Sequence, residues 1–209
     1  SGMGEDVLAA AETIAGGGRA IRAVGHSMGG AAILLAELAR PGTIQAGYLF
    51  EPIVMPAGWQ RPVDNTHMSG PARKRREIFP SRPEAMWRYA ARPPLNALRS
   101  DCLAAYVEYG FHDLEDGTVR LACRAESEAR TFEAAGLMTA DRAAGVGIPV
   151  TVGLGGADAG SNTATMAPGL VDALPNGRLI TYPHLGHFGP LEDPRTIAID
   201  VRTAFGPLG

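Results

Sequence analysis

One stretch, residues 20–39, constrains the fold of this chain more than any other part of the sequence. An apolar run at residues 21–24 has the composition of a buried strand, and a longer apolar run at residues 31–39 has that of a buried helix. Between the two runs lies Gly25-His26-Ser27-Met28-Gly29-Gly30. A serine in such a glycine-flanked turn is held in a strained conformation, with its hydroxyl exposed and a helix N-terminus behind it. The stretch therefore predicts a strand, a tight turn with an exposed serine, and a helix.

Glycine and proline signals in the rest of the sequence predict an α/β fold. Further helices are expected at residues 5–15, 163–174 and 194–205, and further strands at residues 43–50, 149–154 and 178–182. Strands that alternate with helices indicate a mostly parallel sheet with helices on both faces.

The composition changes in the middle of the chain, where prolines and aromatic residues gather. Helices are expected there at residues 71–79, 83–91, 94–108 and 121–135, and no alternation typical of strands is visible. The predicted organisation is thus a core α/β segment at residues 1–51, an inserted helical cap at residues 52–147, and a second core segment at residues 148–209.

Composition excludes several classes of function. A formal net charge of −3 gives no indication of nucleic acid as a partner. No apolar run approaches the roughly 20 residues that a membrane helix needs. The two cysteines, Cys102 and Cys123, do not form a disulfide framework, and no histidine or cysteine spacing suggests a metal site. We expect a cytoplasmic protein without metal or cofactor. Its abundant alanine and glycine and its single lysine, Lys74, are typical of a GC-rich bacterial gene.

A basic run, Arg73-Lys74-Arg75-Arg76, falls on one of the expected helices of the insertion. Its favoured interpretation is a solvated helix face. The alternative is a site for an anionic group such as a carboxylate or coenzyme A.

A serine hydroxyl becomes a competent nucleophile only beside a base, which in turn needs an orienting group. His187 is the favoured base because it lies in the glycine-flanked loop Gly186-His187-Phe188-Gly189 after the last predicted strand. His184, in the same loop, is the rival base. His26 is adjacent to Ser27 and is expected to point elsewhere on the turn.

The orienting acid is expected at the carboxyl end of a strand, where open α/β sheets place their sites. Asp158 follows the strand expected at residues 149–154 and is the first candidate. Glu51 ends the strand that comes directly after the serine helix and is the alternative acid.

The order Ser27, Asp158, His187 and the motifs around these residues resemble the α/β-hydrolase superfamily, especially small bacterial esterase-like serine hydrolases. The resemblance implies a nucleophile elbow at Ser27, a catalytic histidine loop around His187, and a cap in the insertion. It also implies that the Met28 amide contributes to an oxyanion hole.

The expected function is hydrolysis of an ester, thioester, lactone or related acyl bond of a small molecule through a Ser-His-Asp triad. The alternatives are an acyltransferase and a non-catalytic small-molecule-binding protein of the same fold.

The superfamily has further strands before the elbow, and their loop supplies a second oxyanion-hole amide, worth about 2.7–4 kcal/mol. Without them the strand at residues 21–24 would form an uncovered sheet edge. We therefore expect a preceding N-terminal segment, or a second copy in a homodimer, to cover this edge.

Overall fold

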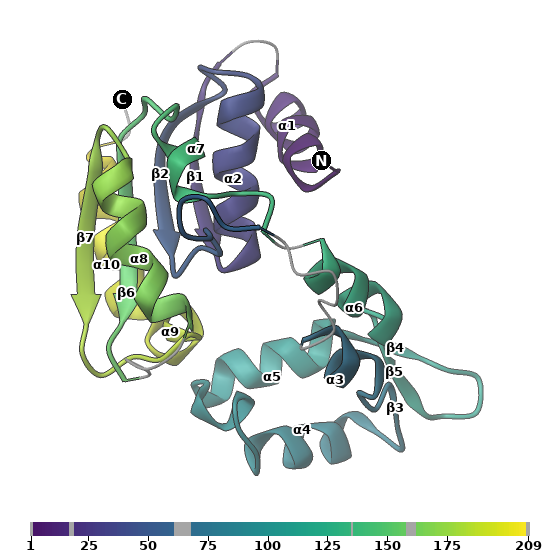
Figure 1. The fold of residues 1–209 in the computed structure, drawn as a ribbon. Helices are drawn as coiled ribbons and strands as arrows, with labels where there is room; N and C mark the ends of the chain where they lie inside the picture. Colours follow the sequence, from purple (N-terminus) through teal and green to yellow (C-terminus); the bar gives the residue numbers. More distant parts are fainter. Residues whose placement is uncertain (1, 17–18, 61–67, 135, 158–161, 208–209) are drawn as a thin grey trace. The chain divides into compact units, whose positions relative to one another are not determined.

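The computed structural model describes residues 2–16, 19–60, 68–134, 136–157 and 162–207. The chain divides into two compact units (Figure 1). Unit 1 comprises Ser1–Gln60, Gly136–Pro190 and Pro194–Gly209, and unit 2 comprises Arg61–Ala135 and Leu191–Asp193. A parallel bridge between Met55 and Thr139 joins the two sequence halves of unit 1. Unit 2 is therefore inserted into the sequence of unit 1.

Unit 1 is built on a four-stranded sheet in which every neighbouring pair is parallel. Its strands, in spatial order, are β1 (Ile21–His26), β2 (Ile44–Phe50), β6 (Val150–Gly155) and β7 (Gly177–Tyr182). In the register of the first pair, His26 lies opposite Phe50. The residues that follow these two partners, Ser27 and Glu51, therefore leave the sheet side by side at its carboxyl edge.

Helices pack on both faces of this sheet, as the sequence predicts (Figure 1). On one face, Leu49 of β2 belongs to an apolar cluster with buried residues of α2 (Met28–Ala39) and α8 (Asn162–Ala173). On the other face, Tyr48 and Phe50 pack with Ile197 of α10 (Pro194–Phe205). Successive side chains of β2 thus pack alternately into two apolar cores, one on each face of the sheet. The remaining helices of unit 1 are α1 (Gly2–Ala15) and α7 (Ala140–Ala143), and the short α9 (Gly189–Glu192) begins in unit 1 and ends among the residues assigned to unit 2.

Helix α2 sits where its sequence predicts, because an apolar run of this kind is stable only when nearly every side is covered. Its residues from Gly30 to Glu37 are buried. The buried Glu37 carboxylate accepts hydrogen bonds from the amides of Gly42 (2.7 Å) and Ile44 (2.9 Å). These two hydrogen bonds therefore fix the turn that leads from α2 into β2.

Strand β1 forms one edge of the sheet. Within the residues that the structure describes, β1 pairs only with β2, and the Val24 side chain is 57% exposed. An apolar side chain on an open strand edge is a liability in water. That a preceding segment or a second copy covers this edge stays a prediction.

Unit 2 combines helices with a small antiparallel sheet. The helices are α3 (Ser69–Arg73), α4 (Arg82–Ala90), α5 (Ser100–Tyr109) and α6 (Ala125–Glu133), with the 3-10 turn η1 (Leu95–Ala97). The strands, in order, are β3 (Ile78–Phe79), β5 (Val119–Leu121) and β4 (Phe111–Asp113). The helix predicted over residues 71–79 is thus wrong beyond Arg73, where a turn and β3 follow, and the helix predicted over residues 121–135 begins only at Ala125, after β5. Strands of two or three residues are too short to produce the alternation by which a sequence indicates a strand.

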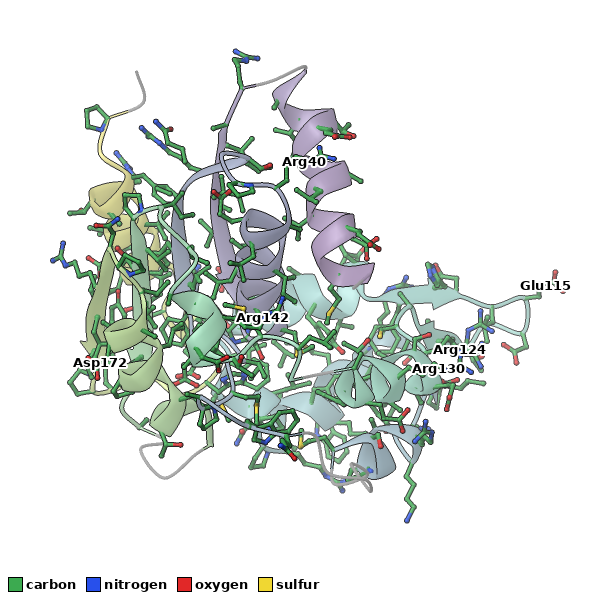
Figure 2. The ribbon with its side chains drawn as sticks, turned by 45° about the horizontal axis from the view of Figure 1, so that its top comes forward. Arg40, Glu115, Arg124, Arg130, Arg142 and Asp172 are labelled. Carbon is green, nitrogen blue, oxygen red and sulfur yellow. The ribbon has the colours of Figure 1, made fainter. Side chains whose placement is uncertain are left out.

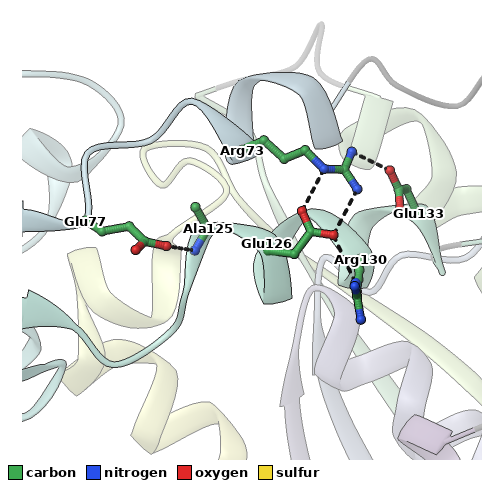
Figure 3. Close-up of polar contacts among 6 residues, drawn as sticks. All are labelled: Arg73, Glu77, Ala125, Glu126, Arg130 and Glu133. Atoms are coloured by element: carbon green, nitrogen blue, oxygen red, sulfur yellow. Dashed lines mark hydrogen bonds and ion pairs between the residues drawn. The ribbon is translucent and has the colours of Figure 1, made fainter.

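The basic run of unit 2 contacts acidic residues of the same unit (Figure 3). Arg73 on α3 binds Glu126 (2.8 Å) and Glu133 (2.6 Å), which both lie on α6. Arg75 binds Glu128 (2.9 Å) on the same helix and donates to the Tyr106 hydroxyl (2.7 Å). Two of the four cations therefore join α3 and its following turn to α6.

Other charged side chains at the surface are also paired within their own unit. Among the residues labelled in Figure 2, Arg40 pairs with Glu12 and Arg124 pairs with Glu77. Glu115 projects from the tip of the turn between β4 and β5 (Figure 2). Within the described part of the chain, no helix is both long enough and apolar enough to cross a membrane.

Candidate active site

Ser27 lies in the sharp turn between β1 and α2. Its backbone has a φ of 54° and a ψ of −122°, a strained conformation for a residue other than glycine. Its amide donates to the Phe50 carbonyl (3.0 Å), so the turn is fastened to the end of β2. Gly25 is required here, because a Cβ at this position would lie 2.8 Å from the backbone of Gly30. The predicted strand, turn and helix are confirmed.

The hydroxyl of Ser27 points to an imidazole rather than to its own helix. Ser27 precedes α2 in the N-cap position, yet its side chain makes no capping hydrogen bond. Its Oγ instead lies 3.1 Å from Nε2 of His187. The rival base of the sequence analysis, His184, is exposed in the same loop. His187 is therefore the histidine that the fold brings to Ser27.

The loop of His187 is positioned by close packing against the end of β6. Leu185 is buried and its carbonyl accepts from the Ala157 amide (3.0 Å). At Gly155 an added Cβ would lie 2.6 Å from the Gly186 carbonyl oxygen. Only glycine at this position allows the histidine loop to approach the strand so closely.

Glu51 supplies the carboxylate next to His187. It is fully buried, and its Oε2 lies 2.7 Å from Nδ1 of His187. Its Oε1 accepts from the amide of Gly155 (2.9 Å). Like Ser27, Glu51 adopts a positive φ, here 41°, directly after its strand. Non-glycine residues in such conformations cluster at functional sites.

The first candidate for the acid, Asp158, lies outside the described residues. The carboxylate that contacts Nδ1 of His187 is that of Glu51, which the sequence analysis ranked second. Both residues follow strands, so the local sequence does not show which strand end meets the histidine; the contact between Glu51 and His187 does.

Together the contacts form a directed chain of hydrogen bonds. Because a carboxylate can only accept, Nδ1 of His187 donates to Glu51, and in the neutral imidazole Nε2 is then left to accept the Ser27 proton. This tautomer allows His187 to deprotonate the serine hydroxyl.

Two further groups surround the serine. Met28 begins α2, and the amides of a first helical turn lack intrahelical acceptors, so they can receive a negative charge. His26, expected to point elsewhere on the turn than the Ser27 hydroxyl, places its Nε2 2.7 Å from the carbonyl oxygen of His187. The sequence offers no signal for this contact except the adjacency of His26 to Ser27.

Burial lowers the pKa of His26 from its usual value of 6.5, and the neighbouring imidazole of His187 lowers it further. His26 is therefore held in its neutral form near the site. The rings of the two histidines lie 4.8 Å apart between centroids. Among the described residues, no cluster of three or more histidine, cysteine, aspartate or glutamate side chains could hold a metal ion.

A surface hollow of about 510 Å³ lies elsewhere on unit 1. Glu12 of α1 and Arg40, Gly42 and Thr43 before β2 line it. These residues precede β2, whereas Glu51 follows it, so the hollow lies at the opposite end of that strand and is not part of this site.

Comparison with solved structures shows the same fold at low sequence identity. The peroxisomal alpha-beta-hydrolase Lpx1 from Saccharomyces cerevisiae has a TM-score of 0.74 and 19% identity over 99% of this chain. E-2-(acetamidomethylene)succinate hydrolase has a TM-score of 0.71 and 18% identity, and the alignment covers 97% of this chain and 72% of that one. The thioesterase domain from the curacin biosynthetic pathway has a TM-score of 0.66 and 16% identity, with coverage of 93% and 70%. The chain spans only 60% of the length of Lpx1.

Sequence comparison identifies the family directly. No curated protein matches the chain. The model of the alpha/beta hydrolase family, in contrast, matches residues 3–201, which is nearly the whole sequence. The chain therefore belongs to the alpha/beta hydrolase family.

Proposed function

We propose that this protein is a serine hydrolase in which Ser27, His187 and Glu51 act as nucleophile, base and orienting acid. The observation that supports this most strongly is the pair of contacts of one imidazole, 3.1 Å to the Ser27 hydroxyl and 2.7 Å to the Glu51 carboxylate. A buried carboxylate, a histidine and a partly exposed serine, hydrogen-bonded in this order, constitute the machinery of acyl transfer to water.

The reaction follows from this geometry. Oγ of Ser27 attacks the acyl carbonyl while Nε2 of His187 takes the hydroxyl proton. Glu51 accepts from Nδ1 and stabilises the imidazolium that forms. The Met28 amide donates to the oxyanion of the tetrahedral intermediate. His187 then protonates the leaving alcohol or thiol, and water repeats the two steps on the acyl-enzyme to release the acid and free serine.

The substrate class proposed is an ester, thioester, lactone or related acyl bond of a small molecule. The family membership supports hydrolysis in general, and a thioesterase domain is among the structures that share the fold. An alcohol that outcompetes water for the acyl-enzyme would make the same site an acyltransferase.

The decisive experiment is covalent labelling with a fluorophosphonate, followed by peptide mapping and by turnover of p-nitrophenyl esters of increasing chain length. We expect a single adduct on Ser27 and loss of both labelling and turnover in Ser27→Ala. Ser127→Ala, at an exposed serine of α6, is the matched control and keeps both. An adduct on another residue, or turnover that survives Ser27→Ala, contradicts the proposal. Small-molecule binding without labelling of Ser27 would instead indicate a non-catalytic binding protein.

A further inference from the structure

The residue before the nucleophile makes a contact that the proposed mechanism does not use. His26 is the last residue of β1, and its imidazole is turned toward the loop after β7. Its Nε2 lies 2.7 Å from the carbonyl oxygen of His187. Since a carbonyl oxygen only accepts, Nε2 of His26 donates the proton of this hydrogen bond.

This contact completes a closed path of covalent bonds and hydrogen bonds that links Ser27, His26 and His187. Starting at Ser27, the path passes along the backbone to His26 and through its hydrogen bond to the His187 carbonyl. It then runs along the His187 side chain and returns over 3.1 Å to the serine hydroxyl. The residue covalently next to the nucleophile is thus hydrogen-bonded to the backbone of the base.

The contact lies between two other backbone hydrogen bonds of the loop. Before His187, the carbonyl of Leu185 accepts from Ala157, and after it the Gly189 amide donates to Gly186. Between these points, the carbonyl of His187 itself accepts from the His26 ring. The imidazole of His26 also lies 5.8 Å from the ring of Phe188 and 6.2 Å from the ring of Phe50, measured between centroids.

We infer that His26 is a positioning residue that holds the backbone of His187, and with it the imidazole, at attacking distance from Ser27. The inference rests on the proposed triad. His26 touches neither the serine oxygen nor the carboxylate in this role, so it acts only through His187.

The charge state of His26 fits this role. The charged groups that act on it are the His187 imidazole and the Glu51 carboxylate. Its lowered pKa keeps the ring neutral at physiological pH. A neutral ring avoids placing a second positive charge beside the imidazolium that His187 becomes during each proton transfer.

Two variants distinguish the effect of the His26 hydrogen bond from the effect of its aromatic ring. His26→Phe keeps a planar ring but has no donor, whereas His26→Gln presents an amide N–H at nearly the same reach as Nε2. We expect His26→Phe to lower kcat about tenfold with KM within about twofold, because a 1 Å misplacement of a catalytic group can cost about 100-fold. His26→Gln should restore kcat to within about threefold of the wild type.

The same two variants are tested for the rate of fluorophosphonate labelling of Ser27 and for thermal unfolding. Equal kcat and labelling rates in His26→Phe and the wild type would overturn the inference. A loss that His26→Gln fails to rescue while its unfolding midpoint is unchanged would overturn it too. Failure of the wild type itself to label at Ser27 would contradict the triad rather than the role of His26.

A measurement on the wild type covers the case in which His26→Phe does not fold. Long-range ¹H–¹⁵N NMR distinguishes the two neutral tautomers of each histidine. We expect His26 to carry its proton on Nε2 at neutral pH. A proton on Nδ1 would leave nothing to donate to the His187 carbonyl, and the inference would be wrong.

Discussion

Replacing Glu51 by glutamine tests whether this carboxylate is the acid of the triad. The side chain keeps its size, so the fully buried site is filled as before. Both of its oxygens, however, accept hydrogen bonds: Oε2 from Nδ1 of His187 and Oε1 from the Gly155 amide. Glutamine offers one acceptor and one donor group and cannot satisfy both partners.

Either orientation of the new amide damages the site. If the amide oxygen faces Gly155, the amide NH₂ faces Nδ1 of His187. Nδ1 must then act as an acceptor, so the single proton of the neutral imidazole lies on Nε2. That tautomer cannot accept the Ser27 proton. With its oxygen toward His187, the NH₂ opposes the Gly155 N–H, and a buried donor is left unpaired at a cost of about 1–3 kcal/mol. The wrong tautomer of a triad histidine costs about 10⁴-fold in kcat, which is about 5.4 kcal/mol at 1.36 kcal/mol per factor of ten.

The assay is kcat for a p-nitrophenyl ester at fixed pH, with urea unfolding as a check that the variant is folded. We expect Glu51→Gln to lose about 10⁴-fold in kcat. Asp158→Asn is the discriminating comparison, because Asp158 was the first candidate from the sequence. If Glu51→Gln stays within tenfold of the wild type while Asp158→Asn loses its activity, the assignment of the acid to Glu51 is refuted.

Two other predictions concern stability. Gly155→Ala should cost about 1–3 kcal/mol in urea unfolding, because its Cβ would lie 2.6 Å from the Gly186 carbonyl. Gly169→Ala, at an open position of α8, should instead stabilise by about 0.5–1 kcal/mol, and equal effects of the two would contradict the packing argument. Because the folded-state pKa of His26 is lowered from 6.5, the unfolded chain binds more protons just below that pH. The stability that His26 contributes is therefore complete above pH 6.5 and declines as the pH falls. Unfolding of His26→Gln between pH 7.5 and 5.5 should lack this decline, and parallel curves for the two proteins would show that the pKa is not lowered.

The parts of the fold that the sequence predicts correctly are those with long, consistent patterns. The apolar run of α2, bounded by the serine turn and Pro41-Gly42, allows no other element. Unit 2 was harder to predict, because β3, β4 and β5 contain only two or three residues each. Such strands form because their partners are nearby in space, and this information is absent from local sequence.

The site was predictable to different degrees. Ser27 and His187 are marked by glycines that a tight turn and a close-packed loop require. No glycine pattern of this kind surrounds Glu51. Its position beside Ser27 follows from the pairing of His26 with Phe50, and this pairing joins residues that are far apart in the sequence. The hydrogen bond from His26 to the histidine loop joins residues 161 positions apart and had no sequence signal of its own.

The spatial order of the strands explains why a glutamate on β2 can serve this histidine. Following the sheet from β1 to β7, the four strand ends supply in turn Ser27, Glu51, the amide of Gly155 and the loop of His187. The third strand end thus contributes a backbone donor to one carboxylate oxygen, and the other oxygen faces Nδ1 of His187. Because the acid leaves the strand next to that of the nucleophile, and both residues have a positive φ, one register determines the position of both. A shift of that register by one residue would move Ser27 and Glu51 to opposite faces of the sheet edge, so the pairing of β1 with β2 is the structural condition for the whole site.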